Sequence, residues 1–393
     1  MNDDTDLYKR LAWAVCASLV VTAMGCGTDS AAPPVGDDTP PPVDVPPDQP
    51  GPFATRISRS STIAISEDNA HVAMVNPDDG SLSVFATSDN SRSAKLGTGG
   101  NPSSVVIAAD NKTAYVANRA DGTVVKISGI DGGTPSIAAM AQVGAEPAGL
   151  ALSPSGKRLF VAEFAQSRVS VIDTATMTVS ASINIDRPRA VLVTNNGDKN
   201  DADEQLVVSQ YYGVPVPGRE AKDDGRTGLV STFSLGDLSR LKDITLSPID
   251  SGFTVTTSPN QLASMAVAAN RVYITSVSAS PEGPTKFDGN VFPVVYVADL
   301  TSGTEVRDAS GTANLARKIY DAIPVSSAAS PRFIPGDLSD IAFLGNTQVA
   351  YAIGKAGDMM LRMAYGTKLD IGSTQNKEID LAGNATIGLC QEM

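Results

Sequence analysis

The fold is decided by the stretch AYVANRADGTVVKI at residues 114–127, in which two apolar runs flank an Asp-Gly pair. Asp-Gly favours a tight hairpin turn, because glycine accepts the positive φ that such a turn requires. The first run, 114–118, is apolar on both faces, as expected of a strand packed between two sheets. The stretch therefore predicts two antiparallel strands of a sheet that is buried on both sides.

The same pattern repeats along the chain. Equivalent positions in the three clearest copies are Asn76, Asn118 and Glu163, which lie 42 and 45 residues apart. Each copy reads as strand, polar turn, apolar strand, short turn and alternating strand, and a fourth strand follows, such as TVSASINI at 178–185. Four antiparallel strands in each such unit are the arrangement of a β-propeller blade.

Two of these copies, AYVANRADGTVVKI (114–127) and LFVAEFAQSRVSVIDTAT (159–176), resemble the YVTN repeat family of prokaryotic β-propellers. The resemblance covers residues 60–185, becomes thin afterwards, and implies a propeller fold. Lactonase-type propellers are similar in outline, but the site residues on which their activity depends cannot be placed in this sequence, so that likeness implies the fold alone. Propellers of the WD type are disfavoured because the single tryptophan, Trp13, precedes the repeats.

Divergent copies can be followed through their apolar strands, which we expect at residues 205–210, 271–276 and 349–354. The predicted fold class is therefore all-β, a β-propeller of about six four-stranded blades. Residues 383–389 resemble the start of a blade at 100–106, so a truncated seven- or eight-bladed ring stays open beside a six-bladed ring with a tail. We also expect residues 56–58 to form an outer strand that closes the ring.

The first residues predict export. An uncharged apolar run of 15 residues, 11–25, follows Lys9 and Arg10. It is shorter than the roughly 20 residues that a bilayer span needs, and its length fits a signal-peptide core. The run ends in Ala-Met-Gly before Cys26, which resembles the bacterial lipobox and implies lipidation of Cys26. Ordinary cleavage nearby, with Cys26 free, is the alternative.

We therefore divide the chain into a lipoprotein signal peptide at 1–25, a lipidated N-terminus and disordered linker at 26–52, and the β-propeller at 53–393. Residues 27–52 contain nine prolines, five aspartates and no lysine or arginine, a composition that cannot bury a core. We expect the protein in the bacterial cell envelope, periplasmic or at the cell surface, with the lipid anchor as its only membrane contact. The oligomeric state is left open.

Composition narrows the function. A formal net charge of −13 repels a polyphosphate backbone, so we expect no nucleic-acid partner. The single histidine, His71, occupies a position that holds Thr113 and Arg158 in sister copies, and we interpret it as a surface or turn residue. A histidine-rich zinc or copper site is excluded, and C-x-x-C-H and G-x-S-x-G motifs are absent. We expect a binding module more than an enzyme and no cofactor, with calcium as an alternative.

The calcium alternative comes from an acidic run between the first and second strands of the fourth unit, where oxygen ligands gather. The spacing lacks the glycine and the terminal glutamate of an EF-hand. The other interpretation is a solvated acidic turn. The candidate ligands are Asp198, Asn200, Asp201, Asp203 and Glu204.

The loops that follow the apolar strands differ in length between the units. In four units, six residues lead from the end of the apolar strand to the first apolar position of the next, whereas the fourth and fifth units take 19 and 18. The two expanded loops, 211–228 and 277–293, follow the same strand of successive blades, so we expect them side by side. Long loops on a rigid scaffold commonly carry binding.

We predict that this rim recognises a protein or glycan at the cell envelope, with aromatic anchors and charged groups that orient the partner. The alternatives are that the loops only pack on each other, and that the chain is the propeller portion of an enzyme, either a lactonase-like hydrolase or a haem-linked electron-transfer protein. The candidate binding residues are Tyr211, Tyr212, Arg219, Lys286, Phe287 and Phe292 in the loops, and Asn76, Asn118, Glu163 and Gln210 at the strand ends.

Overall fold

The computed structural model describes residues 57–380 except 284, 286–288, 328–331, 346 and 372–377. The chain divides into two units, Met1–Pro46 and Pro47–Met393, and the described residues all belong to the second. The predicted signal peptide, Cys26, the linker and the segment 383–389 lie outside the described residues. None of the helices within the described part is long and apolar enough to cross a membrane.

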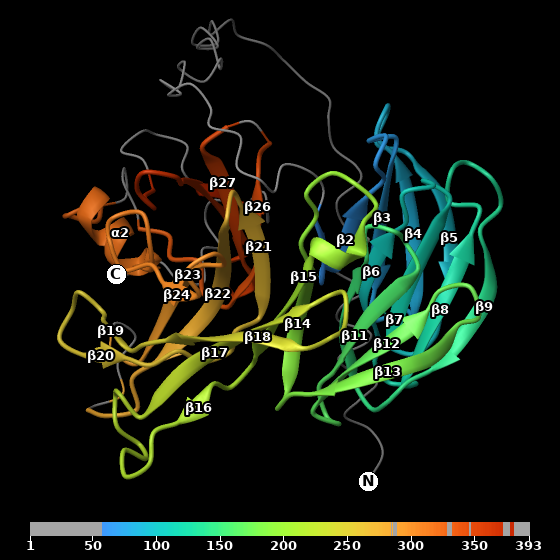
Figure 1. The fold of residues 1–393 in the computed structure, drawn as a ribbon. Helices are drawn as coiled ribbons and strands as arrows, with labels where there is room; N and C mark the ends of the chain where they lie inside the picture. The colour runs from blue at the N-terminus through green and yellow to red at the C-terminus, as the bar shows by residue number, and fades with distance from the viewer. Residues whose placement is uncertain are drawn as a thin grey trace, which may run out of the picture. The chain divides into compact units, whose positions relative to one another are not determined.

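Six antiparallel sheets form the blades of a β-propeller (Figure 1), which confirms the predicted fold class. In the first three blades the strands follow one another in chain order. Blade 1 contains β2 (Ile63–Ile65), β3 (His71–Asn76), β4 (Ser81–Ala86) and β5 (Arg92–Gly97). Blade 2 contains β6 (Pro102–Ile107), β7 (Thr113–Asn118), β8 (Thr123–Ser128) and β9 (Ser136–Gln142). Blade 3 contains β10 (Pro147–Leu152), β11 (Arg158–Glu163), β12 (Arg168–Asp173) and β13 (Thr178–Asn184).

The later blades have the same three inner strands, and blades 4 and 5 differ from the first three in their outer or added strands. Blade 4 contains β14 (Pro188–Val193), β15 (Gln205–Gln210), β17 (Arg226–Ser234) and β18 (Arg240–Leu246), with β16 (Val214–Pro215) pairing on β17. Blade 5 contains β21 (Ser264–Ala268), β22 (Arg271–Ala279) and β23 (Val291–Asp299), with β24 (Thr304–Glu305) and β25 (Ala313–Asn314) sharing the outer position. Blade 6 contains β26 (Leu338–Phe343), β27 (Val349–Gly354), β28 (Met359–Ala364) and β29 (Glu378–Asp380). The apolar strands expected at 205–210, 271–276 and 349–354 are thereby confirmed.

Successive blades pack face to face through their first strands, β6 against β10, β10 against β14, β14 against β21 and β21 against β26. Tyr115 of blade 2 shares one buried cluster with Leu150 and Leu159 of blade 3. The sheets of blades 2–5 are therefore covered on both faces, which is why their second strands are buried along most of their length instead of alternating.

The helix α2 (Leu315–Ala322) was not expected from the sequence. The side chain of Asn314 accepts a hydrogen bond from the backbone N–H of Ala316 and so caps the first turn. The helix buries Leu315 and Ile319 against the core that blades 4, 5 and 6 share. A short pair, β19 (Ile249–Asp250) and β20 (Thr256–Thr257), completes this part of the chain.

The expected outer strand at 56–58 is wrong. The strand β1 (Ser58–Arg59) pairs instead with β14, the first strand of blade 4, with Ser58 opposite Val193 and Arg59 opposite Leu192. The first strands carry unpaired backbone groups along their inner edge, and β1 satisfies those of β14. We call residues 58–61 the axial segment, because it contacts the first strands of several blades.

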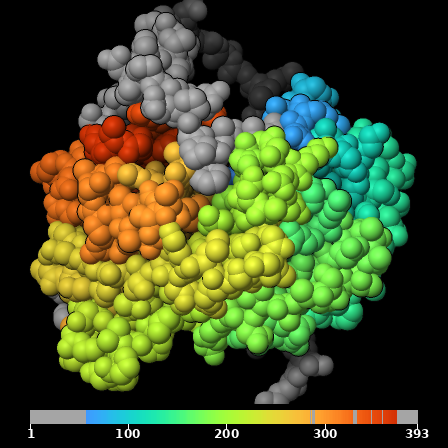
Figure 2. All heavy atoms as spheres, viewed as in Figure 1, coloured from blue at the N-terminus to red at the C-terminus, as the bar shows by residue number. Residues whose placement is uncertain are grey.

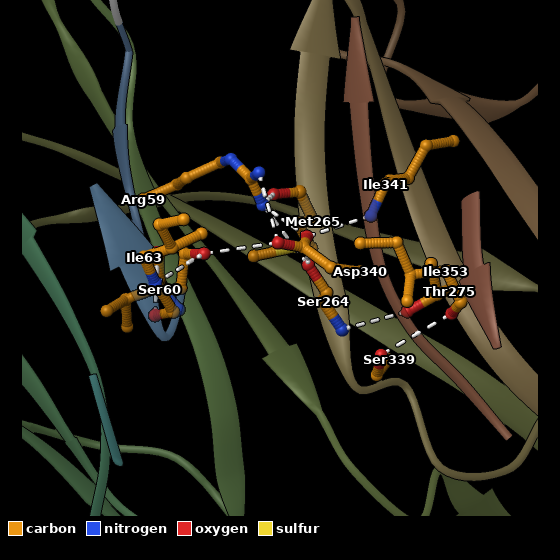
Figure 3. A network of polar contacts seen from close by, with 12 residues as sticks. Arg59, Ser60, Ile63, Ser264, Met265, Thr275, Ser339, Asp340, Ile341 and Ile353 are labelled. Carbon is orange, nitrogen blue, oxygen red and sulfur yellow. Dashed lines mark hydrogen bonds and ion pairs between the residues drawn. The ribbon is translucent and has the colours of Figure 1, made fainter. Parts of the chain in front are cut away.

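The axial segment is held by polar contacts that come from different blades (Figure 3). The guanidinium of Arg59 donates to both carboxylate oxygens of Asp340 in blade 6, at 2.5 and 3.2 Å. Asp340 also accepts from the hydroxyl groups of Ser61 at 3.1 Å and of Ser264 in blade 5 at 2.6 Å. This network ties the N-terminal strand to the last blades of the propeller.

Candidate functional site

The turns after the second strands and the connections into the first strands lie at the same end of the blades, because the strands alternate in direction. We call this end the loop rim. Both expanded loops lie on it as hairpins that prolong their strands: Val214 pairs with Thr227, and β22 and β23 stay paired as far as Ala279 and Val291. The hairpin after β15 protrudes from the body of the propeller (Figures 1 and 2).

The two hairpins lie side by side, as expected from their positions in successive blades. The side chain of Lys222 forms an ion pair of 2.7 Å with Glu282. One carboxylate oxygen of Asp223 accepts from the hydroxyl of Ser280 at 2.8 Å and from the backbone N–H of Glu282 at 2.9 Å. The loops therefore support each other and form one continuous surface.

The predicted loop residues have different positions. Tyr212 is 39% exposed on the rim, and Tyr211 is half-buried beside it. Arg219 is exposed and its Nε donates to Asp224 of the same hairpin at 2.9 Å. Lys286 and Phe287 lie outside the described residues.

Phe292 requires a correction, because it is only 1% exposed. Its ring stacks on Phe253 at a centroid distance of 5.6 Å, and Phe253 in turn meets the ring of Tyr320 in α2. The physical reason is that β23 begins at Val291, so Phe292 is a strand residue facing the core and not a loop residue. It is not a surface anchor in this structure.

The four strand-end residues lie on the rim, yet two of them are closed to a partner. Asn118 and Glu163 are fully buried. The amide of Asn118 donates to the carbonyl of Thr98 at 2.9 Å, and Glu163 forms an ion pair with Arg168. Asn118 therefore holds the connection from blade 1, and Glu163 holds the turn of its own blade.

The other two strand ends, Asn76 and Gln210, are partly exposed. The amide of Asn76 donates to the hydroxyl of Ser81 across its turn, at 3.0 Å. Of the four predicted strand ends, Asn76 and Gln210 therefore stay available to a partner.

The acidic run lies between β14 and β15, at the end of blade 4 opposite the loop rim. Asp201 accepts from the backbone N–H of Ser155 at 2.9 Å and from Arg158 at 3.2 Å. Burial alone would raise the pKa of Asp201, but these hydrogen bonds outweigh it, so its pKa is lowered. Glu204 is buried and accepts from the backbone N–H of Asn196 at 2.6 Å.

The other predicted calcium ligands are also engaged with the chain. Asp198 accepts from the backbone N–H of Asn200, whose side chain caps the short 3-10 helix η1 (Asp201–Asp203), and Asp203 accepts from the amide of Asn196. Within the ranges that the structure describes, no group of three or more His, Cys, Asp or Glu side chains is arranged to hold a metal ion. Calcium binding stays a prediction.

A feature that the sequence analysis missed surrounds the propeller axis on the loop rim. Five polar residues of the described chain adopt left-handed backbone conformations just before a first strand, with φ between 39° and 56°: four directly precede the strand and one lies three residues before it. We call them the mouth ring; they are Asn101, Glu146, Arg187, Gln261 and Asp337.

The backbone holds the mouth ring in place. The carbonyl of Glu146 accepts from the N–H of Phe164 at 3.0 Å, and that of Arg187 accepts from Tyr211 at 3.1 Å. Left-handed φ is uncommon for residues other than glycine, asparagine and aspartate, and such strain collects at functional sites. The one signal in the sequence is a proline directly after three of the five residues.

Charged and aromatic side chains contact the residues of the mouth ring, and together they form one band on the loop rim. Arg119 and Glu146 form an ion pair of 3.3 Å, and the hydroxyl of Tyr211 contacts the amide oxygen of Gln261 at 3.2 Å. The guanidinium of Arg187 lies over the ring of Tyr212, 5.5 Å from its centroid. Burial raises the pKa of Tyr211, so its hydroxyl stays protonated.

Three aromatic rings form the apolar part of this band. Tyr211 and Tyr212 meet edge to face at 4.8 Å, and Phe164 of blade 3 lies 5.7 and 6.0 Å from them. Between blades 2 and 3 the rim is hollowed into a depression of about 610 Å³, whose polar lining includes Arg119, Asp121, Gln142 and Glu146. The arrangement offers ring faces, both signs of charge and amide groups within one mouth.

Comparisons with known proteins support the fold. Residues 90–187 match the family model described as lactonase, 7-bladed beta-propeller. Among solved structures, hydrazine synthase of Kuenenia stuttgartiensis is similar with a TM-score of 0.58 and 16% identity, over 82% of this chain and 79% of that one.

Two further solved structures are more distant. A functionally unknown protein of Desulfotomaculum acetoxidans DSM 771 has a TM-score of 0.45 and 15% identity over 66% of this chain and 75% of that one. U3-55K has a TM-score of 0.48 and 13% identity over 81% of this chain and 82% of that one. No curated protein matches. At these identities the likeness to solved structures shows the propeller fold alone.

Proposed function

We propose that this protein is a binding or scaffold module of the bacterial cell envelope, anchored through lipidated Cys26, whose loop rim recognises a protein or glycan. The observation that carries the proposal is the pair of adjacent hairpins joined by Asp223 and Glu282, beside the partly exposed rings of Tyr211 and Tyr212. Loops that are held rigid beside aromatic and arginine side chains are the usual make-up of an interaction surface.

The rigidity of the rim supports recognition. Because the hairpins are already paired and joined to each other, a partner would not have to order them, and ordering costs affinity. Arg187 over Tyr212 likewise limits the freedom of the exposed ring. Such a preformed surface suits capture of a partner whose contacts are made mainly by the rim.

Photocrosslinking on two ends of the same blade tests the proposal. A photoreactive residue at Tyr212 reports on the loop rim, and one at the exposed Lys199 reports on the opposite end of blade 4. In intact cells we expect a discrete adduct from position 212 and none from position 199. Replacing Tyr212 by alanine should weaken partner capture about tenfold or more, as for an aromatic anchor. Equal adducts from both ends, or none, would contradict a recognition rim.

A lactonase-like hydrolase is the second candidate, favoured by the family match over residues 90–187. In this case Glu146 is the carboxylate of the mouth that would act as a base, next to Arg119. Purified full-length protein is then expected to open a simple lactone, and the variant Glu146→Gln to lose that activity. Hydrolysis no faster than in buffer would remove this candidate.

A further inference from the structure

Arg189 is a half-buried cation near the mouth ring that has no counterion among the residues that the structure describes. It lies on β14, two residues after Arg187 of the mouth ring, and is half-buried. Its guanidinium donates to the carbonyl of Ala148 at 3.2 Å and forms no ion pair with any residue that the structure describes. Burial, and after it the nearby positive charge of Arg119, lower the pKa of Arg189.

Three other partly buried arginines of the propeller have a carboxylate partner. Arg59 pairs with Asp340, Arg158 pairs with Asp201, and Arg119 pairs with Glu146. Glu146 is the carboxylate whose charge acts on Arg189. Because Glu146 is already paired with Arg119, it does not serve as the ion-pair partner of Arg189. A desolvated charge without a partner is unfavourable for the free protein. Its presence in a mouth therefore points to an anion that arrives from outside.

The surroundings of Arg189 limit the direction from which such an anion arrives. Behind its backbone lies the axial segment: a Cβ atom on Gly149 would come within 2.9 Å of the carbonyl oxygen of Arg189 and 2.2 Å of the hydroxyl of Ser60. Arg189 and Ala148, whose carbonyl accepts from the guanidinium, are each the second residue of a first strand, counted from the loop rim. An entering group therefore reaches Arg189 from the rim and meets the axial segment beyond it.

The charge pattern favours one carboxylate over a polyanion. Glu146 and Asp337 of the mouth ring are negative, Arg187 is positive, and the chain as a whole carries a net charge of −13. A polymer with many negative groups would be repelled by Glu146, by Asp337 and by the net charge of the chain. A peptide segment presents a single carboxylate among neutral amides, and the amides of Asn101 and Gln261 can hydrogen-bond to such a backbone.

We propose that the guanidinium of Arg189 binds a carboxylate of a protein partner whose peptide segment enters the mouth from the loop rim. The proposal rests on the proposed function, which it deepens by naming the group that is recognised. Arginine binds carboxylates through two parallel hydrogen bonds, which specify orientation as well as affinity. The carboxylate comes from either the C-terminus of the partner or an acidic side chain.

The first test measures thermal unfolding of the full chain without a partner. The variant Arg189→Met removes a cation that has no counterion, so we expect its Tm to stay the same or rise. The control Arg158→Met removes a cation of similar burial that is paired with Asp201, and its Tm should fall. A fall for Arg189→Met as large as that for Arg158→Met would show a structural role and overturn the proposal.

The second test uses short N-acetylated alanine–glycine peptides as probes at millimolar concentration. One has a free C-terminus, one is amidated, and one is amidated but contains a glutamate. We expect a carboxylate peptide to raise the Tm of the wild-type chain and to bind Arg189→Met at least tenfold more weakly, while the fully neutral peptide has no effect. The free-terminus and glutamate peptides distinguish the two sources of the carboxylate.

The same experiment contains the outcomes that contradict the proposal. A glucuronate disaccharide that acts on the wild type while the peptides do not would overturn the assignment to a peptide. If the carboxylate peptides bound Arg189→Met as tightly as they bind the wild-type chain, the assignment of the site to Arg189 would be overturned. If crosslinking at Tyr212 persists in the Arg189→Met protein, the proposed recognition rim survives and the inference about Arg189 fails. If Arg189-dependent peptide binding persists without crosslinks, only the recognition rim fails.

Discussion

Blades 1–3 and blades 4–6 use the same framework with different regularity. In blades 1–3 most strands have six or seven residues, and each sheet follows chain order. In blades 4 and 5, β17, β22 and β23 have nine residues, and β16, β24, β25 and α2 are added, whereas blade 6 again follows chain order with six residues in each of β26, β27 and β28. All of these additions lie at the rim or the outer edge. The inner strands pack on neighbouring blades and therefore tolerate little change in length, whereas the loops and the outer strands tolerate additions.

The two halves are also joined differently. Blades 1–3 are linked by apolar clusters to which several strands of neighbouring blades contribute, whereas the axial segment reaches the later blades through a charged network at Asp340. It touches the regular half as well, since the hydroxyl of Ser58 accepts from the backbone N–H of Leu152 at 2.7 Å and the carbonyl of Ser61 accepts from Val105 at 2.9 Å.

The largest effect is expected from Arg59→Met. Arg59 and Asp340 have side chains only 20% and 19% exposed, so the variant leaves a carboxylate poorly solvated and unpaired. We expect the free energy of unfolding to fall by about 3 kcal/mol. Chemical denaturation of the full chain measures this loss.

The double variant Arg59→Met with Asp340→Leu is the matched control. It removes both charges, and we expect it to recover most of the lost stability, because the unpaired carboxylate causes the penalty. A double variant as unstable as the single one would indicate that Arg59 acts through packing.

The next effect distinguishes two glycines within the regular half. A Cβ at Gly149 would lie 2.2 Å from the hydroxyl of Ser60, whereas a Cβ at Gly97 in β5 would meet nothing within 4 Å. We expect Gly149→Ala to destabilise the protein by about 2 kcal/mol through overpacking, and Gly97→Ala to be neutral or slightly stabilising. The difference in Tm between the two variants measures how closely the axial segment packs against residue 149. Equal values for both would contradict it.

A smaller effect is expected where the irregular half is joined at the rim. Asp223→Ala removes the acceptor for Ser280 and Glu282, so the hairpins should separate while the blades stay folded. We expect a loss of about 1 kcal/mol. Hydrogen exchange should become faster at the backbone N–H of Glu282 and stay unchanged in β11. Unchanged exchange at Glu282 would show that the hairpins are held by other contacts.

The smallest effect concerns Asp201, which joins blade 4 to Ser155 and Arg158 of blade 3. Its folded-state pKa is lowered, so its stabilisation is present above the ordinary value of 3.8 and is lost as the pH falls through the folded-state pKa. Asp201→Asn should therefore cost about 1 kcal/mol or less at neutral pH, since solvent screens the pair. Its unfolding curve should approach that of the wild type in acid. A gap independent of pH would contradict this origin.

Much of the fold could be predicted because local pattern and tertiary packing agree. The strands at 114–118 and 205–210 are apolar on both faces, and that pattern has few explanations other than stacked sheets. Phe292 was misplaced because the length of a loop does not show how far its strands continue. The helix α2 was missed because eight residues are too few for a clear helical period.

The candidate site was predictable only in part. The neighbourhood of the two expanded loops followed from counting residues between strands, since successive blades repeat the same connections. The residues of the mouth ring could not be predicted in this way, because the left-handed φ at Glu146 or Arg187 is imposed by backbone hydrogen bonds to the adjacent strand. These residues look like ordinary loop residues in the sequence.

The sequence by itself determined the repeating blade, its number of strands and the rim on which long loops gather, because hydrophobic periodicity and turn chemistry are local properties of the chain. Only the tertiary structure decided that β1 pairs with β14, that Arg59 meets Asp340, and that Arg189 has no counterion among the described residues. The physical reason is that these contacts join residues far apart in the chain, and the position of a charge relative to others depends on how the blades close around their axis.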